Sequence, residues 1–310
     1  MNVEAGLYIH FPFCIRKCSY CDFYSLPYNP QRARDYCEAL RCEIKAESAR
    51  ARWGKIGSIY LGGGTPSLIA PYDLGTLLDL VRRFFPVDPE CEITLEANPG
   101  TIDLARLKAI SQTGVNRVSL GVQSLDGSEL NLLGRIHTRD QAIRAVDFLH
   151  DAGITNYGLD LIYGIPGQTL AGWRKTLQEA ISLSPSHLSC YLLQMDETVP
   201  LSQRLKTGEL LALSEDEESD MYYHMVDDLG RAGYHQYEIS NFSRPGMESR
   251  HNLNYWEAGE YLGLGAGAVS FRDGTRYRNL PQLEQYLHNL LLGNTTPPRE
   301  IQESLTGKDL

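Results

Sequence analysis

Short apolar runs alternate with amphipathic stretches along the first two thirds of the chain. The β-prone runs lie at residues 6–10, 58–61, 92–96, 117–121, 157–162 and 187–193, and several of them are closed by Gly, Pro or Asn. Stretches of helix-forming composition follow at residues 31–51, 72–85, 103–112, from 128, 138–151 and 170–182. Six strands that alternate with helices predict an α/β fold with a parallel sheet and right-handed crossovers. The pattern leaves an incomplete barrel and a doubly wound sheet open.

The alternation ends near residue 198. The acidic run at residues 214–220 predicts a helix that extends to about Arg231, with Ser214 as its cap, because carboxylates stabilise a helix N-terminus. The other elements that we expect are a strand at 234–240, a hairpin turn at Asp273-Gly274, a helix at 281–292 and little structure after 298. We therefore divide the chain into a core domain, residues 1–200, and a smaller C-terminal α+β region, residues 201–310.

Composition narrows the class of protein. The chain has 310 residues, is 42% hydrophobic and has no apolar run long enough to span a bilayer. Its net charge of -10 argues against nonspecific nucleic-acid binding, which needs a basic face. No secretory signal opens the chain, and its seven cysteines are an odd number. These features predict a protein of the reducing cytoplasm.

Three of the seven cysteines lie within eight residues. Cys14, Cys18 and Cys21 have x3 and x2 spacing on a short loop, and thiolates so placed can bind one iron–sulfur cluster. One iron of a [4Fe–4S] cluster would then lack a protein ligand. A structural zinc site is an alternative, with His10 or a distant cysteine as the fourth ligand. A disulfide is a weaker alternative in a cytoplasmic protein.

Polar and glycine residues stand where the predicted strands end, which is where ligands bind in both architectures. Gly62, Gly63 and Gly64 allow a close backbone approach, although a structural turn explains them equally well. The other candidates are Glu96, Gln123, Arg135, Asp160 and Ile162, which suit a zwitterionic nucleoside. Without the cysteine loop, helix capping and hydrogen bonds that hold loops in place would also explain these residues.

The cysteine loop, between an aromatic-rich strand and a helix, resembles that of the radical S-adenosylmethionine superfamily. This resemblance implies an incomplete (β/α)6 barrel. It also implies that S-adenosylmethionine chelates the open iron and is cleaved to a deoxyadenosyl radical, so that the cofactor carries the chemistry and the protein positions it.

Further motifs narrow the resemblance to the family of oxygen-independent coproporphyrinogen III oxidases. They are Tyr8 before the cysteines, Gly-Gly-Gly-Thr-Pro at 62–66, Leu-Glu-Ala-Asn-Pro at 95–99, Gly-Val-Gln-Ser at 121–124, Leu-Gly-Arg at 133–135 and Asp-Leu-Ile-Tyr-Gly-Ile-Pro at 160–166. The resemblance implies that the cofactor site is lined by Tyr8, Gly63, Gly64, Thr65, Glu96, Gln123, Arg135, Asp160 and Ile162.

Two departures favour the HemW-type haem-chaperone branch of this family over the decarboxylating oxidases. The oxidases have a further cysteine at the position of Phe23, and an N-terminal extension for which the fourteen residues up to Cys14 leave no room. We expect a haem chaperone without oxidase activity, with the oxidase as the alternative. The C-terminal region is short for this branch, which suggests a truncated form.

The stretch His251-Asn252-Leu253-Asn254-Tyr255-Trp256 is the candidate haem site. An imidazole beside two aromatics can bind iron and stack on a macrocycle, but alone this pattern is more typical of a packed core corner. The resemblance favours haem, with His251, Asn252, Tyr255 and Trp256 as its site. Arginines at 244, 250, 272, 276 and 278 could pair with haem propionates or form a solvated face.

The resemblance implies several partners. They are haem, haem-acceptor proteins and a reductant such as a flavodoxin-like donor or NADH, without nucleic acid or a transmembrane segment. The sequence leaves the oligomeric state open, with a homodimer as one alternative.

Overall fold

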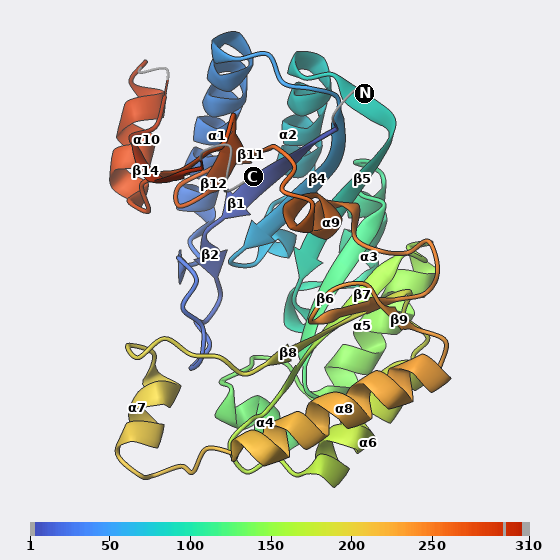
Figure 1. Cartoon of the computed structure of the whole chain (residues 1–310). Helices are drawn as coiled ribbons and strands as arrows, with labels where there is room; N and C mark the ends of the chain where they lie inside the picture. Colours follow the sequence, from blue (N-terminus) through green and yellow to red (C-terminus); the bar gives the residue numbers. More distant parts are fainter. Residues whose placement is uncertain (1–3, 294–295, 306–310) are drawn as a thin grey trace.

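A single twelve-stranded sheet organises the chain in this computed structural model, which describes residues 4–293 and 296–305 (Figure 1). The strand order is β14-β13-β12-β11-β1-β4-β5-β6-β7-β8-β10-β9. A separate two-stranded ladder, β2 (Phe13–Cys14) with β3 (Leu26–Pro27), brackets the cysteine loop. The C-terminal strands therefore extend the main sheet.

The six predicted strands lie side by side in chain order and are parallel. They are β1 (Ala5–Phe11), β4 (Ile56–Gly63), β5 (Val87–Ala97), β6 (Arg117–Gln123), β7 (Tyr157–Tyr163) and β8 (His187–Leu192). A doubly wound sheet reverses its strand order at a switch point, whereas this order never reverses between β1 and β8. The α/β fold is confirmed, and its sheet is an incomplete (β/α)6 barrel.

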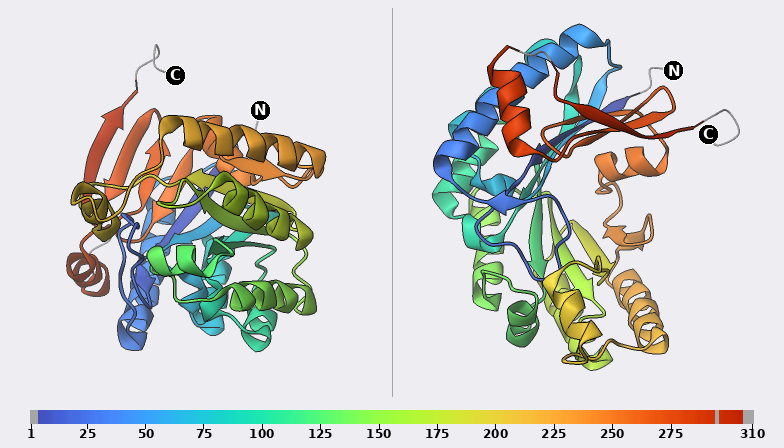
Figure 2. Two further views of the ribbon diagram at one scale, coloured as in Figure 1. Left: turned by 90° about the horizontal axis from the view of Figure 1, so that it is seen from below. Right: turned by 90° about the vertical axis from the view of Figure 1, so that its left-hand side faces the viewer.

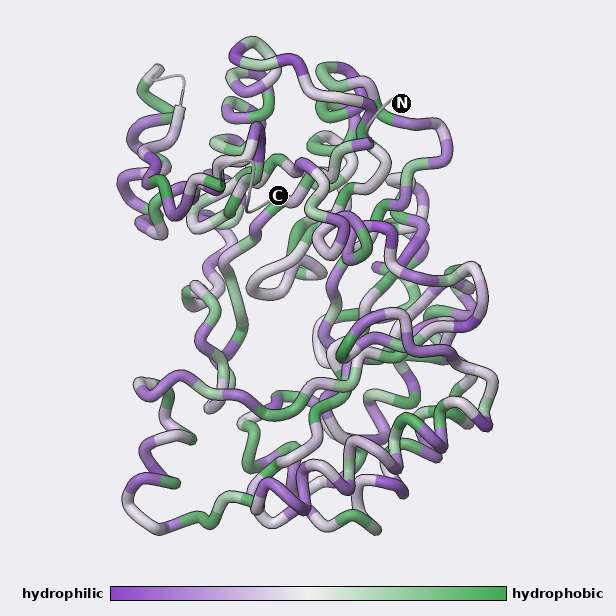
Figure 3. Tube along the Cα trace, in the orientation of Figure 1, coloured by the Kyte–Doolittle hydropathy of each residue, from purple (hydrophilic) through white to green (hydrophobic). Residues whose placement is uncertain are grey.

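Helices join these strands and cover the outer face of the curved sheet (Figure 2). They are α1 (Pro30–Arg50), α2 (Pro71–Phe84), α3 (Leu104–Ser111), α4 (Gly127–Leu132), α5 (Arg139–Asp151) and α6 (Leu170–Ser182), with 3-10 turns η1 (Pro66–Leu68) and η2 (Pro99–Thr101). Capping side chains stabilise the helix N-termini. At α5, for example, Thr138 and Gln141 form a capping box. Figure 3 shows that hydrophobic and hydrophilic positions are interspersed along these helices, as expected of helices with one face on a sheet and the other in solvent.

The C-terminal region adds short elements at both edges of the sheet. Its helices are α7 (Pro200–Lys206), α8 (Glu215–Arg231), α9 (Arg250–Trp256) and α10 (Leu283–Leu291), and its strands are β9 (His235–Gln236), β10 (Asn241–Ser243), β11 (Tyr261–Leu264), β12 (Val269–Arg272), β13 (Thr275–Asn279) and β14 (Arg299–Ser304). The helix after the Ser214 cap and the hairpin at Asp273-Gly274 are confirmed.

Two expectations for this region are wrong. The strand predicted at 234–240 is only the short β9, and β10 follows it in a hairpin. Little structure was expected after residue 298, yet β14 pairs antiparallel with β13, the outer strand of the β12–β13 hairpin.

The core is continuous across the proposed boundary at residue 200. Strand β11 pairs in parallel with β1, and its residues Leu262 and Leu264 are fully buried in the core. The boundary at residue 200 stays a prediction. Among the described residues, no helix is long and apolar enough to cross a membrane.

Candidate functional site

A cavity of about 510 Å³ lies where β4 to β8 end, inside the range typical of cofactor sites. Predicted residues that line it are Cys14, Cys18, Cys21, Gly63, Gly64, Thr65, Glu96, Gln123, Arg135, Asp160 and Ile162. The structure therefore gathers the cysteine loop and the ends of five strands around one space.

The cysteine loop is tied to the turn that follows α4. The Ser19 amide donates to the Leu133 carbonyl at 3.1 Å, and the Ser19 hydroxyl donates to that of Leu132 at 2.8 Å. The Arg16 guanidinium donates to the carbonyls of Gly134 and Arg135 at 2.8 and 2.6 Å. These bonds fix the loop beside the turn that carries Arg135.

Polar side chains contact two of the three thiols. The Thr65 hydroxyl lies 3.5 Å from the sulfur of Cys14, and Nη1 of Arg135 lies 3.3 Å from the sulfur of Cys18. Burial raises the pKa of Cys14 and raises that of Cys21 to about 11, so both are protonated at neutral pH. Binding of iron would release these protons.

No group of three or more His, Cys, Asp or Glu side chains within the described part of the chain is close enough to hold a single metal ion. The three cysteines line one cavity without meeting at a point. A tetrahedral zinc ion needs its donors at one point, whereas the sulfurs that hold a cluster bind different irons.

Packing against the end of β1 explains the glycines at the end of β4. A Cβ atom on Gly63 would lie 2.3 Å from the His10 ring, and one on Gly64 would lie 2.7 Å from the Phe13 backbone. Gly63 also has φ of +108°, which favours glycine. Both glycines line the cavity, but contact with residues 10–13, rather than approach to a ligand, excludes a side chain here.

Two half-buried carboxylates, Glu96 and Asp160, also line the cavity. Glu96 accepts hydrogen bonds from the Tyr60 hydroxyl at 3.0 Å and the Gly63 amide at 3.1 Å. Burial, reinforced by the nearby Asp160 charge, raises the pKa of Glu96 to about 7. Asp160 accepts from the Ser119 hydroxyl at 2.9 Å, and burial raises its pKa as well. The pair offers oxygen atoms that can accept ribose hydroxyls.

Arg135 lies between the cysteine loop and strand β6. Its Nη2 donates to the Gly121 carbonyl at 2.6 Å, while its buried Nε has no hydrogen-bond partner among the described residues. An unpaired buried donor is costly, so this atom indicates a site for an anionic group such as a carboxylate. Gln123 also faces the cavity, from a strained backbone with φ of +67°.

Among the residues that the resemblance assigns to the cofactor site, Tyr8 does not line the cavity. Its ring lies against that of Tyr60, with centroids 6.2 Å apart, and its hydroxyl bonds Nδ1 of His10 at 3.0 Å. A contact between Tyr8 and the cofactor stays a prediction.

The polar residues of the cavity that sequence reasoning missed include Tyr60, Ser119 and Tyr191. Tyr60 lies two positions before Gly62, and Ser119 lies four positions before Gln123, both of which were candidates from the sequence. Side chains two apart share a face of a strand, so strict alternation would have identified Tyr60 and Ser119.

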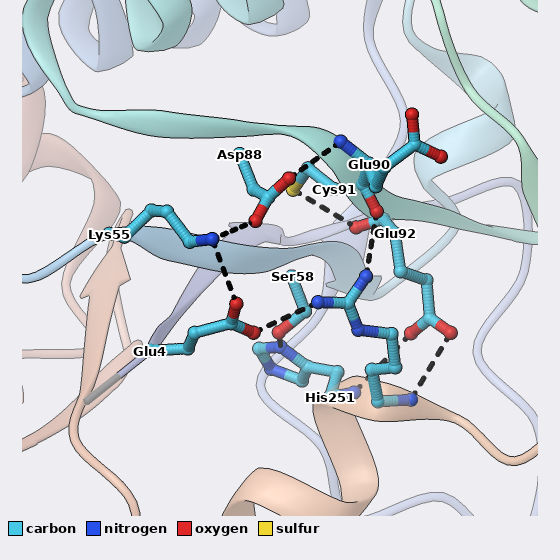
Figure 4. Close-up of polar contacts among 9 residues, drawn as sticks. Glu4, Lys55, Ser58, Asp88, Glu90, Cys91, Glu92 and His251 are labelled. Carbon is cyan, nitrogen blue, oxygen red and sulfur yellow. Dashed lines mark hydrogen bonds and ion pairs between the residues drawn. The ribbon is translucent and has the colours of Figure 1, made fainter. Parts of the chain in front are cut away.

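The predicted haem residues lie apart from this cavity, on α9 at the opposite ends of the strands. Glu92 caps this helix, because its carboxylate accepts from the amides of Arg250 at 3.1 Å and His251 at 3.3 Å (Figure 4). The Arg250 side chain donates to Glu4 at 2.9 Å and to the Glu90 carbonyl at 2.6 Å. These contacts fix α9 beneath β4 and β5.

The motif residues differ in exposure. His251 is buried, whereas Tyr255 and Trp256 are 41% and 57% exposed. Nδ1 of His251 lies 2.9 Å from the Ser58 hydroxyl, and Nε2 lies 2.9 Å from the Tyr255 hydroxyl. The imidazole thus has partners on both nitrogens, while the two aromatic side chains are partly exposed to solvent.

The arginines near this motif do not form one pocket. Arg244 and Arg272 lie over the rings of Tyr234 and Trp53, at 4.6 and 4.9 Å, and Arg276 pairs with Glu303. These three arginines thus contact partners on different elements of the fold.

Comparison with known proteins assigns the family. The Radical SAM superfamily profile matches residues 8–180. The heme chaperone HemW of Lactococcus lactis is 38% identical over 280 residues, which cover 90% of this chain and 73% of the relative. The heme chaperone HemW of Escherichia coli is 40% identical over 273 residues, which cover 87% of this chain and 71% of the relative. The chain belongs to the HemW heme chaperone family of the radical SAM superfamily.

The HemW family shares its fold with an enzyme. The coproporphyrinogen III oxidase HemN of Escherichia coli, a radical SAM enzyme, superposes on 99% of this chain and 73% of its own, with a TM-score of 0.85 and 25% identity. The fold expected of a HemW protein is therefore confirmed, whereas the individual site residues stay predictions.

Proposed function

We propose that this protein is a haem chaperone, which carries haem at α9, holds a [4Fe–4S] cluster and S-adenosylmethionine in the cavity, and passes haem to acceptor proteins. The observation that carries the proposal is the identity to HemW proteins over most of the chain, together with the cavity in which three cysteines face carboxylates and an arginine.

In the cavity, Cys14, Cys18 and Cys21 would hold the cluster as thiolates. Arg135 supports this role, because its guanidinium lies 3.3 Å from the sulfur of Cys18 and its unpaired Nε can bind the methionyl carboxylate. Glu96 and Asp160 would accept the ribose hydroxyls. When bound and reduced, the cluster supplies one electron to S-adenosylmethionine.

At α9, Trp256 and Tyr255 supply exposed aromatic surface for the macrocycle, and His251 supplies an imidazole for its iron. Burial, with a contribution from Arg117, lowers the pKa of His251 to about 3, so the ring is neutral at physiological pH. A neutral imidazole is the form that binds iron. Asn252 belongs to the same turn and completes the proposed site.

The oxidase is a second candidate, which the likeness to the Escherichia coli enzyme over nearly the whole chain favours. Against it, Phe23 stands where we expect the oxidases to have a further cysteine, and it is 65% exposed at the rim of the cavity. We therefore place the oxidase second.

The remaining partners are part of the proposal. We infer a reductant such as a flavodoxin-like donor or NADH, because a cluster in this cavity needs an external electron. We also propose a homodimer and a cytoplasmic location, and the seven unpaired cysteines support a reducing compartment.

Anaerobic incubation with reductant, S-adenosylmethionine and coproporphyrinogen separates the two candidates. We expect no protoporphyrinogen from cluster-loaded protein, and we expect stoichiometric haem binding in a parallel titration. Steady formation of protoporphyrinogen would contradict the chaperone and support the oxidase.

A further inference from the structure

The imidazole of His251 is buried among residues of β1, β4 and α9. Ser58 bonds its Nδ1 and Tyr255 its Nε2, both at 2.9 Å. The Tyr60 ring stacks on it with centroids 5.2 Å apart, and a Cβ atom on Gly6 would lie 3.1 Å from its Cε1. Figure 4 shows the ring beside Ser58. Iron can therefore reach His251 only after a neighbour moves.

Among these neighbours, Tyr255 is the most exposed to solvent. It is 41% exposed, whereas Ser58 is buried in β4 and Tyr60 is half-buried. Tyr255 lies in the last turn of the short helix α9, and its ring packs edge-on against Tyr261 with centroids 4.6 Å apart. A rotation of this one side chain toward solvent would uncover Nε2.

The two hydrogen bonds of the ring are complementary. A neutral imidazole has one N–H donor and one lone pair. If Nδ1–H donates to the Ser58 hydroxyl, the lone pair on Nε2 accepts the Tyr255 O–H. That lone pair is the one an iron atom would take, and histidines that bind metals commonly donate their other N–H in this way.

We propose that Ser58 and Tyr255 are positioning residues of the haem site: Ser58 holds His251 in the tautomer that presents Nε2, and the Tyr255 hydroxyl caps Nε2 until haem iron replaces it. The inference rests on the proposed haem-binding function. In the exchange, the hydrogen bond from Tyr255 breaks and a bond from Nε2 to iron forms. The phenolic proton stays on Tyr255, so no electron or proton is transferred.

The two residues should have opposite effects on haem affinity. Tyr255→Phe keeps the aromatic ring but leaves Nε2 without a partner in the free protein, and iron binding removes that penalty. Haem should therefore bind about tenfold more tightly. Ser58→Ala removes the group that orients the imidazole, and losses of about tenfold are typical of such partners.

The test is an anaerobic titration of the cluster-loaded full chain with ferric haem, followed by absorbance. Tyr72→Phe, at an 81% exposed tyrosine, and Ser243→Ala, at a buried serine, are matched controls that should match wild type. Melting temperatures check that each variant is folded. An electron paramagnetic resonance spectrum of the haem iron that is the same in Tyr255→Phe and wild type, but altered in His251→Ala, would support His251 as the ligand.

Tighter binding by Tyr255→Phe would support the inference, and the conservative change decides it even if Ser58→Ala fails to fold. Unchanged or weaker binding by Tyr255→Phe, with normal binding by wild type, would overturn the cap while leaving the proposed function intact. If wild type bound no haem, the proposed function would fail and the inference with it.

Discussion

The Tyr60 ring stacks on His251, with centroids 5.2 Å apart and an angle of 28° between the planes, while its hydroxyl donates to Glu96 at 3.0 Å. One side chain thus contacts both candidate sites, because Tyr60 lines the cavity and covers the imidazole of α9. Tyr60 thus lies between the cofactor cavity and the proposed haem site, beside Tyr8, whose ring stacks on those of both Tyr60 and His251.

Tyr60 variants should separate its two contacts. Tyr60→Phe keeps the stack and removes the hydrogen bond to Glu96, so the affinity for S-adenosylmethionine should fall by about fivefold with haem affinity unchanged. Tyr60→Leu removes the stack as well and should weaken both. Calorimetry and haem titration measure the two affinities; a loss of haem affinity in Tyr60→Phe as large as in Tyr60→Leu would argue against separate contacts.

Loss of one thiol should abolish the cluster. Cys18→Ala removes the sulfur that Arg135 contacts, and two thiols do not hold a [4Fe–4S] cluster firmly. Iron and sulfide per chain should fall to near zero after anaerobic reconstitution. Cys42→Ala is the control, because Cys42 lies on α1 outside the cavity. A normal cluster spectrum in Cys18→Ala would remove this assignment.

Arg135→Lys tests the proposed carboxylate contact. Lysine keeps the positive charge but loses the planar fork, so the affinity for S-adenosylmethionine should fall by at least about tenfold while iron content is retained. Equilibrium dialysis of cluster-loaded protein measures this affinity. Arg139→Lys, at an arginine that pairs with Glu179 away from the cavity, should behave as wild type. Equal affinities in the two variants would speak against the contact.

Glu43 should make stability depend on pH. Its carboxylate accepts hydrogen bonds from Tyr286, the Gly265 amide and Asn279, and burial raises its pKa from 4.5 to about 7. Between these values the folded state holds a proton that the unfolded state has released. The contribution of Glu43 to the free energy of unfolding is therefore full below pH 4.5 and lost as pH rises through 7, a fall of about 3 kcal/mol.

Urea unfolding of Glu43→Gln measures this contribution. The stability difference between wild type and Glu43→Gln should change across that pH range, whereas Glu284→Gln, at an exposed residue, should leave the wild-type profile unchanged. A difference that is the same at every pH would show that Glu43 does not titrate there.

The parallel strands and their helices were predictable because each carries a local signal. Residues 170–182 have the predicted helix bounds, and the Ser214 cap begins α8 as expected. Pairing between distant segments has no such signal. The parallel pairing of Gly6 with Tyr261 and the addition of β14 depend on contacts far apart in the chain.

The cavity was predictable for a different reason. Once parallel strands are recognised, their carboxyl ends must meet, so Glu96 and Asp160 could be brought together without coordinates. The burial of His251 could not be predicted, since it depends on Ser58, nearly two hundred residues away, and on the Tyr255 rotamer. The packing reason for Gly63 and Gly64 is likewise visible only in the fold.

Iron, sulfide and haem contents of one anaerobic preparation test the central claim most directly. After reconstitution and haem loading, the account predicts about four irons and four sulfides in the cluster of each chain. It also predicts about one haem per chain, which His251→Ala should lose. Zinc in place of iron, or a cluster without any haem, would contradict it.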